Sequence, residues 1–161
     1  MARLGVDVVQ IACGDPHHAA WDEGDAMPTA ALAAGFRMSG TMLGFPGEDY
    51  TTPAHIERTG GFADPATRAE RLEVLRWGLD RTRQLGLSDI MFHAGFLPEV
   101  GDPGRTSFLD TLAKAADMAG EITVAFETGQ ETSTLLRRTL DDLKCPNVKV
   151  NFDPANVLLY D

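Results

Sequence analysis

The sequence is poor in cysteine, in basic residues and in long apolar runs, and each shortage excludes a class of protein. Its two cysteines, Cys13 and Cys145, stand far apart and form neither a CxxC metal site nor a disulfide framework. The chain has 14 Lys and Arg but 24 Asp and Glu, and the resulting net charge of −10 argues against nucleic-acid binding. No apolar run approaches the roughly 20 residues that cross a membrane, and the N-terminus is too weak for a signal peptide. We therefore predict a cytoplasmic protein without nucleic-acid or membrane partners.

The composition that remains is that of an ordinary globular domain. The chain has 161 residues, of which 43% are hydrophobic and 24% charged. This length supports one substantial core. Neither a linker nor a low-complexity segment interrupts it, so residues 1–161 are predicted to form a single domain.

Short apolar runs alternate with helical patterns along the chain. One helix is expected to begin at an N-cap, Asp64, followed by Pro65, and to end at Gly86. Alternating strands and helices predict βα units and a parallel sheet, which is an α/β fold. Most strands read as continuous apolar runs, so we expect both faces of the sheet to be covered. The predicted strands are Val6–Ala12, Arg37–Leu43, Asp89–His93, Ile122–Glu127 and Val148–Asp153.

One connection, residues 44–61, is unusually long and dense in Gly, Pro and Thr (GFPGEDYTTPAHIERTGG). We expect it to lack regular structure, and connections of this length are often functional. It follows a strand and precedes a helix, so it should lie at the carboxyl ends of the strands. A substrate lid and a plain surface excursion are about equally consistent with its sequence.

Two carboxylates close strands at that same edge. Glu127 ends the strand of VAFETGQE, and Asp153 ends the strand of VKVNFDPAN. Neighbouring parallel strands lie about 4.8 Å apart, so the two carboxylates could share one cation. The alternative is that both are N-caps after strands, which Pro154 favours for Asp153. Metal binding and capping are about equally probable from this spacing alone.

Three histidines also fall at strand ends on this side. His93 stands in FHAGF, where the small residues after it leave room for a ligand, and we favour a polar substrate contact over simple packing. His17 and His18 follow CGDP, and a solvated loop is their more probable environment.

Together these segments resemble a known family. VAFETGQE followed by VNFDPAN, with MFHAGF one strand earlier and SGTMLGFPGEDYTTP after an early strand, is similar to sugar phosphate isomerase/epimerase proteins with a xylose isomerase-like TIM barrel. By that comparison the chain is an interior portion, running from the second strand to the sixth. A closed (β/α)8 barrel needs at least about 200 residues. The expected fold is therefore an incomplete parallel-strand barrel of about five of the eight βα units.

The resemblance also implies roles for individual residues. In that family one divalent metal is held by Glu, Asp, His and Glu at the ends of strands five to eight. Glu127 matches the first ligand, which also acts as a catalytic base, and Asp153 matches the second. His93, Gln130 and Asn156 match positions that face the substrate. Two carboxylates suit Mn2+ or Mg2+ best, with Co2+ and Zn2+ as alternatives.

The expected activity is a divalent-metal-dependent isomerisation or epimerisation of a sugar or related hydroxy-carbonyl compound. Proton transfer would pass through an enediolate, with the catalytic set incomplete in this chain. A non-catalytic or truncated barrel scaffold is the alternative. An AP endonuclease-like hydrolase is a remote one, because Asn156 stands where a zinc-binding histidine would be needed and the strand Arg37–Leu43 has no histidine. The expected partner is a small molecule, and a homo-oligomer is left open.

Overall fold

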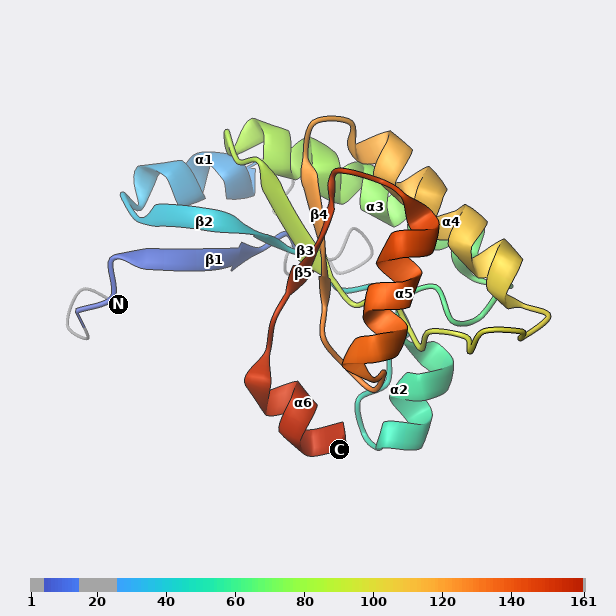
Figure 1. The fold of residues 1–161 in the computed structure, drawn as a ribbon. Coiled ribbons are helices and arrows are strands. Elements are labelled where there is room, and N and C mark those ends of the chain that lie inside the picture. The colour runs from blue at the N-terminus through green and yellow to red at the C-terminus, as the bar shows by residue number, and fades with distance from the viewer. Residues whose placement is uncertain (1–4, 15–25, 161) are drawn as a thin grey trace.

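The computed structural model describes residues 5–14 and 26–160, so the predictions for His17 and His18 lie outside the described residues. Five strands form one sheet whose order follows the chain, β1-β2-β3-β4-β5, and every neighbouring pair is parallel (Figure 1). The five predicted strands are confirmed, and their ends differ from the prediction by at most two residues. They are β1 (Val8–Ala12), β2 (Arg37–Met42), β3 (Asp89–Phe92), β4 (Thr123–Glu127) and β5 (Val148–Asn151).

Helices lie between the strands, and three of them cover one face of the sheet. Figure 1 shows α3, α4 and α5 side by side on that face, while α2 and α6 lie at the carboxyl ends of the strands. None of the helices among the described residues combines the length and apolar character that crossing a bilayer requires. The helices are α1 (Ala26–Ala33), α2 (Pro53–Thr59), α3 (Arg68–Gln84), α4 (Arg105–Ala119), α5 (Ser133–Leu143) and α6 (Pro154–Tyr160).

The core fills the space between the sheet and these three helices. A chain of aromatic rings runs through it, with centroids 5.5 Å apart for Phe45 and Phe92 and 5.6 Å apart for Phe92 and Phe126. Such edge-to-face pairs stabilise a core beyond the area they bury. Leu75, Leu79, Leu112 and Val124, all at most 1% exposed, pack around the rings.

The start of α3 differs from the prediction. Regular helix begins at Arg68 rather than after Asp64, because Asp64 and the three residues after it form a separate hydrogen-bonded turn. In that turn the carboxylate of Asp64 accepts a hydrogen bond of 2.9 Å from the backbone N–H of Ala66. The predicted end is confirmed, since Gly86 follows the helix with a φ of +69°.

Among the described residues, the expectation that both faces of the sheet are covered is met only in part: Met91 of β3, in register with Ala125, is 5% exposed, whereas Lys149 of β5 is exposed. Along β4 the residues alternate, with Val124 and Phe126 buried under the helices and Ala125 half-buried on the other face. That other face borders an open hollow of about 400 Å3, which is lined in part by the exposed Lys149. In a closed barrel all eight strands fill the interior with side chains. Five strands leave it open, with β1 and β5 each paired to a single described neighbour.

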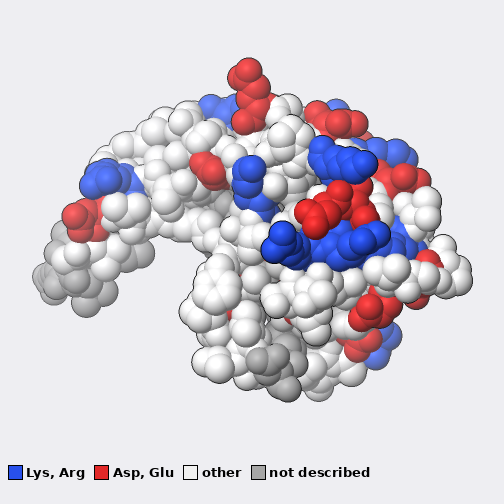
Figure 2. All heavy atoms as spheres, in the orientation of Figure 1, with Lys and Arg blue, Asp and Glu red and all other residues white. Residues whose placement is uncertain are grey.

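Charged side chains of both signs intermingle over the helical side of the molecule (Figure 2). On α5, Arg138 lies 3.0 Å from Asp142, which also accepts a bond of 2.9 Å from the buried Arg105 of α4. The strongest of these contacts therefore ties α4 to α5. The surface around α6 in the same view is largely uncharged.

The long connection, residues 44–61, is not without regular structure, because it contains α2. Pro53 occupies the first turn of α2, and the hydroxyl of Thr52 accepts a hydrogen bond from the backbone N–H of His55, 3.2 Å away. A prolyl first turn with a threonine cap is a standard helix start. The sequence prediction missed α2 because the many Gly, Pro and Thr residues of this segment are typical of loops.

Two charged side chains, the half-buried Glu48 and the buried Arg71, fasten the two ends of this connection together. The carboxylate of Glu48 accepts hydrogen bonds from the backbone N–H of Phe45 at 3.0 Å and of Gly61 at 2.8 Å. The guanidinium of Arg71, on α3, donates to the carbonyls of Pro46, at 3.1 Å, and of Gly61. We call this arrangement the loop clamp.

Replacing Arg71 with methionine should lower the free energy of unfolding by about 2 kcal/mol, because two carbonyls lose their buried donor. Arg71 is 3% exposed, so water cannot readily replace that donor. Urea denaturation followed by circular dichroism measures the change. The control is Arg76→Met on the same helix, since Arg76 contacts Glu73 at the exposed surface and its replacement should cost less than about 0.5 kcal/mol. Equal losses in both variants would contradict the role of the clamp.

Candidate functional site

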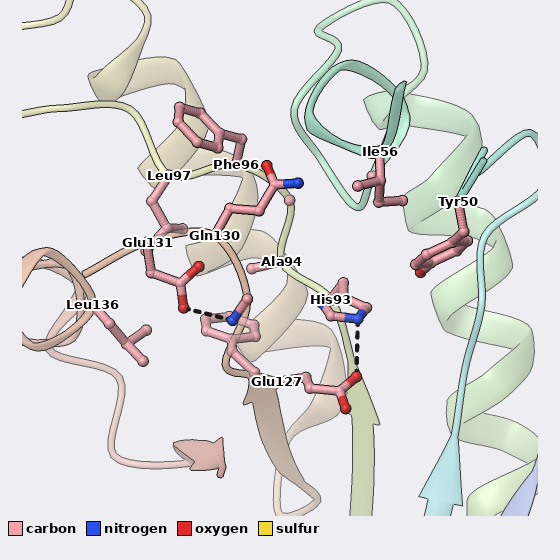
Figure 3. A pocket seen from close by; sticks show the side chains of 14 residues that line it. Tyr50, Ile56, His93, Ala94, Phe96, Leu97, Glu127, Gln130, Glu131 and Leu136 are labelled. Carbon is pink, nitrogen blue, oxygen red and sulfur yellow. Dashed lines mark hydrogen bonds and ion pairs between the residues drawn. The ribbon is translucent and has the colours of Figure 1, made fainter. Parts of the chain in front are cut away.

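The carboxyl ends of β3 and β4 bring His93 and Glu127 into contact. Glu127 is the last residue of β4, and His93 directly follows β3, whose Phe92 is in register with Phe126. The Nε2 of His93 donates to Oε2 of Glu127 over 3.0 Å (Figure 3). Their side chains are 25% and 16% exposed, so the pair is sheltered but reachable from solvent.

This pair stands in a small pocket of about 40 Å3 that is partly open to solvent. One wall is the turn after β4, and the other is the connection of residues 44–61. Tyr50 of that connection places its ring centroid 6.1 Å from that of His93. The remaining lining is mostly apolar and includes Ile56, Ala94, Phe96, Leu97, Phe126 and Leu136.

The electrostatics of the pocket act on His93 in two directions. Burial lowers the pKa of its imidazole, but the hydrogen bond and negative charge of Glu127, helped by Glu48 and Glu131, outweigh burial and raise the pKa above its usual value. The protonated imidazole is thereby favoured. A protonated His93 donates to Glu127 and keeps that carboxylate in a fixed orientation.

Gln130, the third predicted pocket residue near this pair, joins the two walls. Its side-chain amide donates a hydrogen bond of 3.0 Å to the carbonyl of Pro53, at the start of α2. The turn after β4 is therefore tied to a segment 77 residues earlier in the chain. Of the two interpretations of residues 44–61, the structure supports the functional one to this extent: the segment forms one wall of the pocket.

A second carboxyl in the pocket, Glu131, was not identified from the sequence. Its oxygen accepts a hydrogen bond of 3.2 Å from the backbone N–H of Gly129, within its own turn. Burial raises the pKa of Glu131 above its usual value, against the smaller effects of its backbone hydrogen bonds and His93. The signal in the sequence was the spacing ETGQE, which returns a second glutamate to the strand end after a tight turn.

Replacing Glu131 with glutamine should stabilise the protein at neutral pH. A carboxyl whose folded-state pKa is raised binds its proton more tightly when folded, so its ionisation destabilises the fold as pH rises. That penalty is absent below the unfolded pKa, about 4.3, and complete above the folded pKa. The melting temperature of the variant should exceed that of the wild type at pH 7.5, and the gap should close toward pH 4.

The control for this prediction is Glu121→Gln, which removes an exposed carboxylate outside the pocket. It should shift the melting temperature by the same amount at both pH values. A Glu131→Gln variant that melts lower than the wild type at pH 7.5 would contradict the burial penalty.

The other two predicted site residues, Asp153 and Asn156, lie one strand away. The backbone N–H of Asp153 donates to the hydroxyl of Thr128 at 2.8 Å, and the side-chain amide of Asn156 donates to the Thr128 carbonyl at 3.0 Å. One carboxylate oxygen of Asp153 also accepts from the backbone N–H of Ala155 at 2.8 Å, at the start of α6. Neither residue lines the pocket that holds His93 and Glu127. The capping contact uses one of the two carboxylate oxygens of Asp153.

The described residues offer a metal ion only part of a binding site. Within residues 5–14 and 26–160, no three or more His, Cys, Asp or Glu side chains are grouped so that they could hold a metal ion. Glu127 and Asp153 stand at the ends of neighbouring strands, where Glu127 is in register with Asn151. The described residues therefore fit part of a carboxylate shell, and a complete shell needs further ligands.

Comparison with known proteins gives a consistent result. A family model described as xylose isomerase-like TIM barrel matches residues 1–161. A solved xylose isomerase domain protein from Planctomyces limnophilus is 31% identical, with a TM-score of 0.85 over 96% of this chain and 56% of that one. D-allulose 3-epimerase from Methylomonas sp., in complex with D-allulose, is 21% identical, with a TM-score of 0.67 over 99% of this chain and 56% of that one.

An L-ribulose 3-epimerase is 20% identical, with a TM-score of 0.68 over 99% of this chain and 54% of that one. At 20% and 21% identity the two epimerases show the shared fold alone. The chain thus spans a little over half the length of these solved structures. No curated protein matches the sequence.

Proposed function

Because the chain belongs to the xylose isomerase-like TIM-barrel family, we propose that it provides part of a divalent-metal-dependent enzyme that isomerises or epimerises a sugar or related hydroxy-carbonyl compound. The family and the partial barrel expected from the sequence are confirmed. The observation that carries the proposal is the His93–Glu127 pair at the carboxyl ends of β3 and β4, in a pocket that is partly open to solvent. In barrels of this type, active sites occupy that end of the strands.

In this proposal Glu127 acts as the base. Its carboxylate removes the proton from the carbon beside the substrate carbonyl and returns it, through an enediolate, to the same or the neighbouring carbon. The imidazole of His93 holds one carboxylate oxygen by the contact of 3.0 Å, which leaves the lone pairs of the other oxygen for the cation and the proton. Apolar neighbours such as Leu97 and Phe126, each 1% exposed, keep water away from the reacting carbon.

The remaining predicted residues position the substrate and the cation. Gln130 reaches the pocket from the turn after β4, and Asn156 stands beside Asp153 at the end of β5. Glu127 and Asp153 would contribute carboxylate oxygens to the cation, with Mn2+ or Mg2+ the best match to such ligands. When bound, the cation supplies Lewis-acid polarisation of the substrate carbonyl.

Exchange of the substrate's carbon-bound proton with solvent deuterium tests the proposal. Exchange requires only that one base removes a proton and returns a deuteron, so Glu127 suffices even without a second acid or base. The purified chain is incubated with D-fructose and Mg2+ in D2O, and the sugar is analysed by mass spectrometry. Deuterium should enter the sugar in the presence of chain and Mg2+ and stop entering when EDTA is added. No exchange above the protein-free rate would contradict the proposal and favour a non-catalytic barrel scaffold.

A further inference from the structure

We propose that Glu131 is a specificity-determining residue, whose carboxyl hydrogen-bonds a hydroxyl group of an uncharged polyol substrate and repels substrates that carry a phosphate or carboxylate at that position. This inference rests on the proposed function, because it concerns the substrate of the same pocket. It adds the substrate class, which the His93–Glu127 pair does not determine.

Glu131 occupies the wall of the pocket away from Tyr50. Figure 3 shows its carboxyl on the same side as Leu97 and Leu136, with His93 and Tyr50 across the pocket. Leu97 is 1% and Leu136 is 6% exposed. The carboxyl therefore sits against an apolar wall, where a substrate between the two sides would contact it.

The protein supplies only some of the hydrogen bonds that the carboxyl of Glu131 can accept. Its hydrogen bonds come from backbone N–H groups of its own turn, among them that of Gly129 at 3.2 Å. In the part of the chain that the structure describes, no Lys or Arg side chain forms an ion pair with it. A sheltered carboxyl with unused hydrogen-bonding capacity is costly unless a partner completes it. A substrate hydroxyl is such a partner, because it can both donate to and accept from a carboxyl.

The charge of the lining argues against an anionic substrate. Glu127 and Glu131 are the acidic residues of the pocket, the described lining includes neither lysine nor arginine, and its histidine, His93, already donates to Glu127. Proteins bind phosphate groups mainly with arginine, lysine and free backbone N–H groups. A phosphate beside Glu131 would face a carboxyl in a poorly solvated wall, where repulsion between like charges is strong.

The test compares two sugars that differ by one phosphate, D-fructose and D-fructose 6-phosphate. Backbone amide shifts of the 15N-labelled chain are followed during titration with each sugar at matched ionic strength. D-fructose should shift the amides around Glu127, Glu131 and His93, and should bind at least about tenfold more tightly than its 6-phosphate. A gap of that size corresponds to one unfavourable charged contact.

Two variants assign the effect to Glu131. Glu131→Ala should weaken D-fructose binding about tenfold, the loss expected for one hydrogen bond to a carboxyl. Glu131→Gln keeps an acceptor for Gly129 and removes the charge, so the preference for D-fructose over its phosphate should fall about tenfold. Glu57→Gln is the control, because it removes an exposed carboxylate of α2 that does not line this pocket. Amide spectra show directly whether each variant is folded.

The outcomes separate this inference from the proposed function. If D-fructose shifts the amides of His93 and Glu127 equally in the wild type and in both Glu131 variants, the inference is wrong and the proposed function stands. If the wild type binds the 6-phosphate as tightly as D-fructose, the inference is likewise wrong. If neither sugar shifts any amide of the pocket, the proposed function fails and this inference fails with it.

Discussion

Replacing Gly61 with alanine should lower the free energy of unfolding by about 3 kcal/mol or more, one of the largest losses expected from a single methyl group. Gly61 has a φ of +47°, in the left-handed region that disfavours residues with a Cβ. A Cβ placed there would also overlap the main-chain atoms of His93, Ala94 and Gly95. Backbone at the end of a buried strand cannot retreat as a flexible side chain can.

The matched control is Gly86→Ala. Gly86 also has a positive φ, +69°, but nothing lies within 4 Å of the Cβ that alanine would add. Its loss should be limited to the backbone penalty, about 1 kcal/mol. Urea denaturation gives the free energy of unfolding of both variants, and the difference between their losses is the cost of the overlap at Gly61. Similar losses at the two positions would show that the contact between Gly61 and the His93–Gly95 backbone is not as close as the structure has it.

Replacing Glu127 with glutamine should reduce the proposed deuterium exchange into the substrate by about 100-fold or more, the range for loss of a general base. The amide has nearly the same shape and can still accept the hydrogen bond of His93, but it cannot take a proton. Mass spectrometry of the sugar after incubation in D2O measures the rate. The fold should be retained, which circular dichroism verifies.

Glu57→Gln again provides the comparison, because it makes the same chemical change on the exposed face of α2. It should leave the exchange rate within about twofold of the wild type, since general-base catalysis depends on direct contact with the proton. Exchange that persists in Glu127→Gln would mean that another group is the base. Glu131, the second carboxyl of the lining, would then be the first to test.

The fold was predictable because strand and helix signals in this chain are local. Runs such as Ile122–Glu127 contain enough β-branched residues to mark a strand, and the helices between them make the parallel order the natural one. The two-sided burial was predicted correctly for β3 but not for β5, because an apolar run alone does not reveal whether a second layer exists. In the structure Ala125 and Lys149 face a hollow that five strands leave open.

The site was predictable only where it depends on strand ends. His93 and Glu127 meet because adjacent parallel strands deliver their last residues to one place. Asp153 lies two residues beyond the end of β5, where it caps α6 and pairs with Thr128. Spacing in the sequence cannot distinguish these contacts from a ligand position. Tyr50 becomes part of the pocket wall because residues 44–61 pack beside His93, which is distant in the sequence. No local sequence pattern predicts that contact. The metal and substrate roles of these residues stay predictions.

The loop clamp has a consequence for how this pocket can diversify. Glu48 and Arg71 bind backbone groups at positions 45, 46 and 61, so they hold the base of the connection without contacting the side chains of α2. Closing a somewhat longer loop costs little once its ends are fixed. We therefore expect residues 49–59 to tolerate exchange or lengthening, provided that the buried Ile56 is kept. Replacing residues 49–59 as one segment is therefore a direct way to give this pocket a new substrate preference.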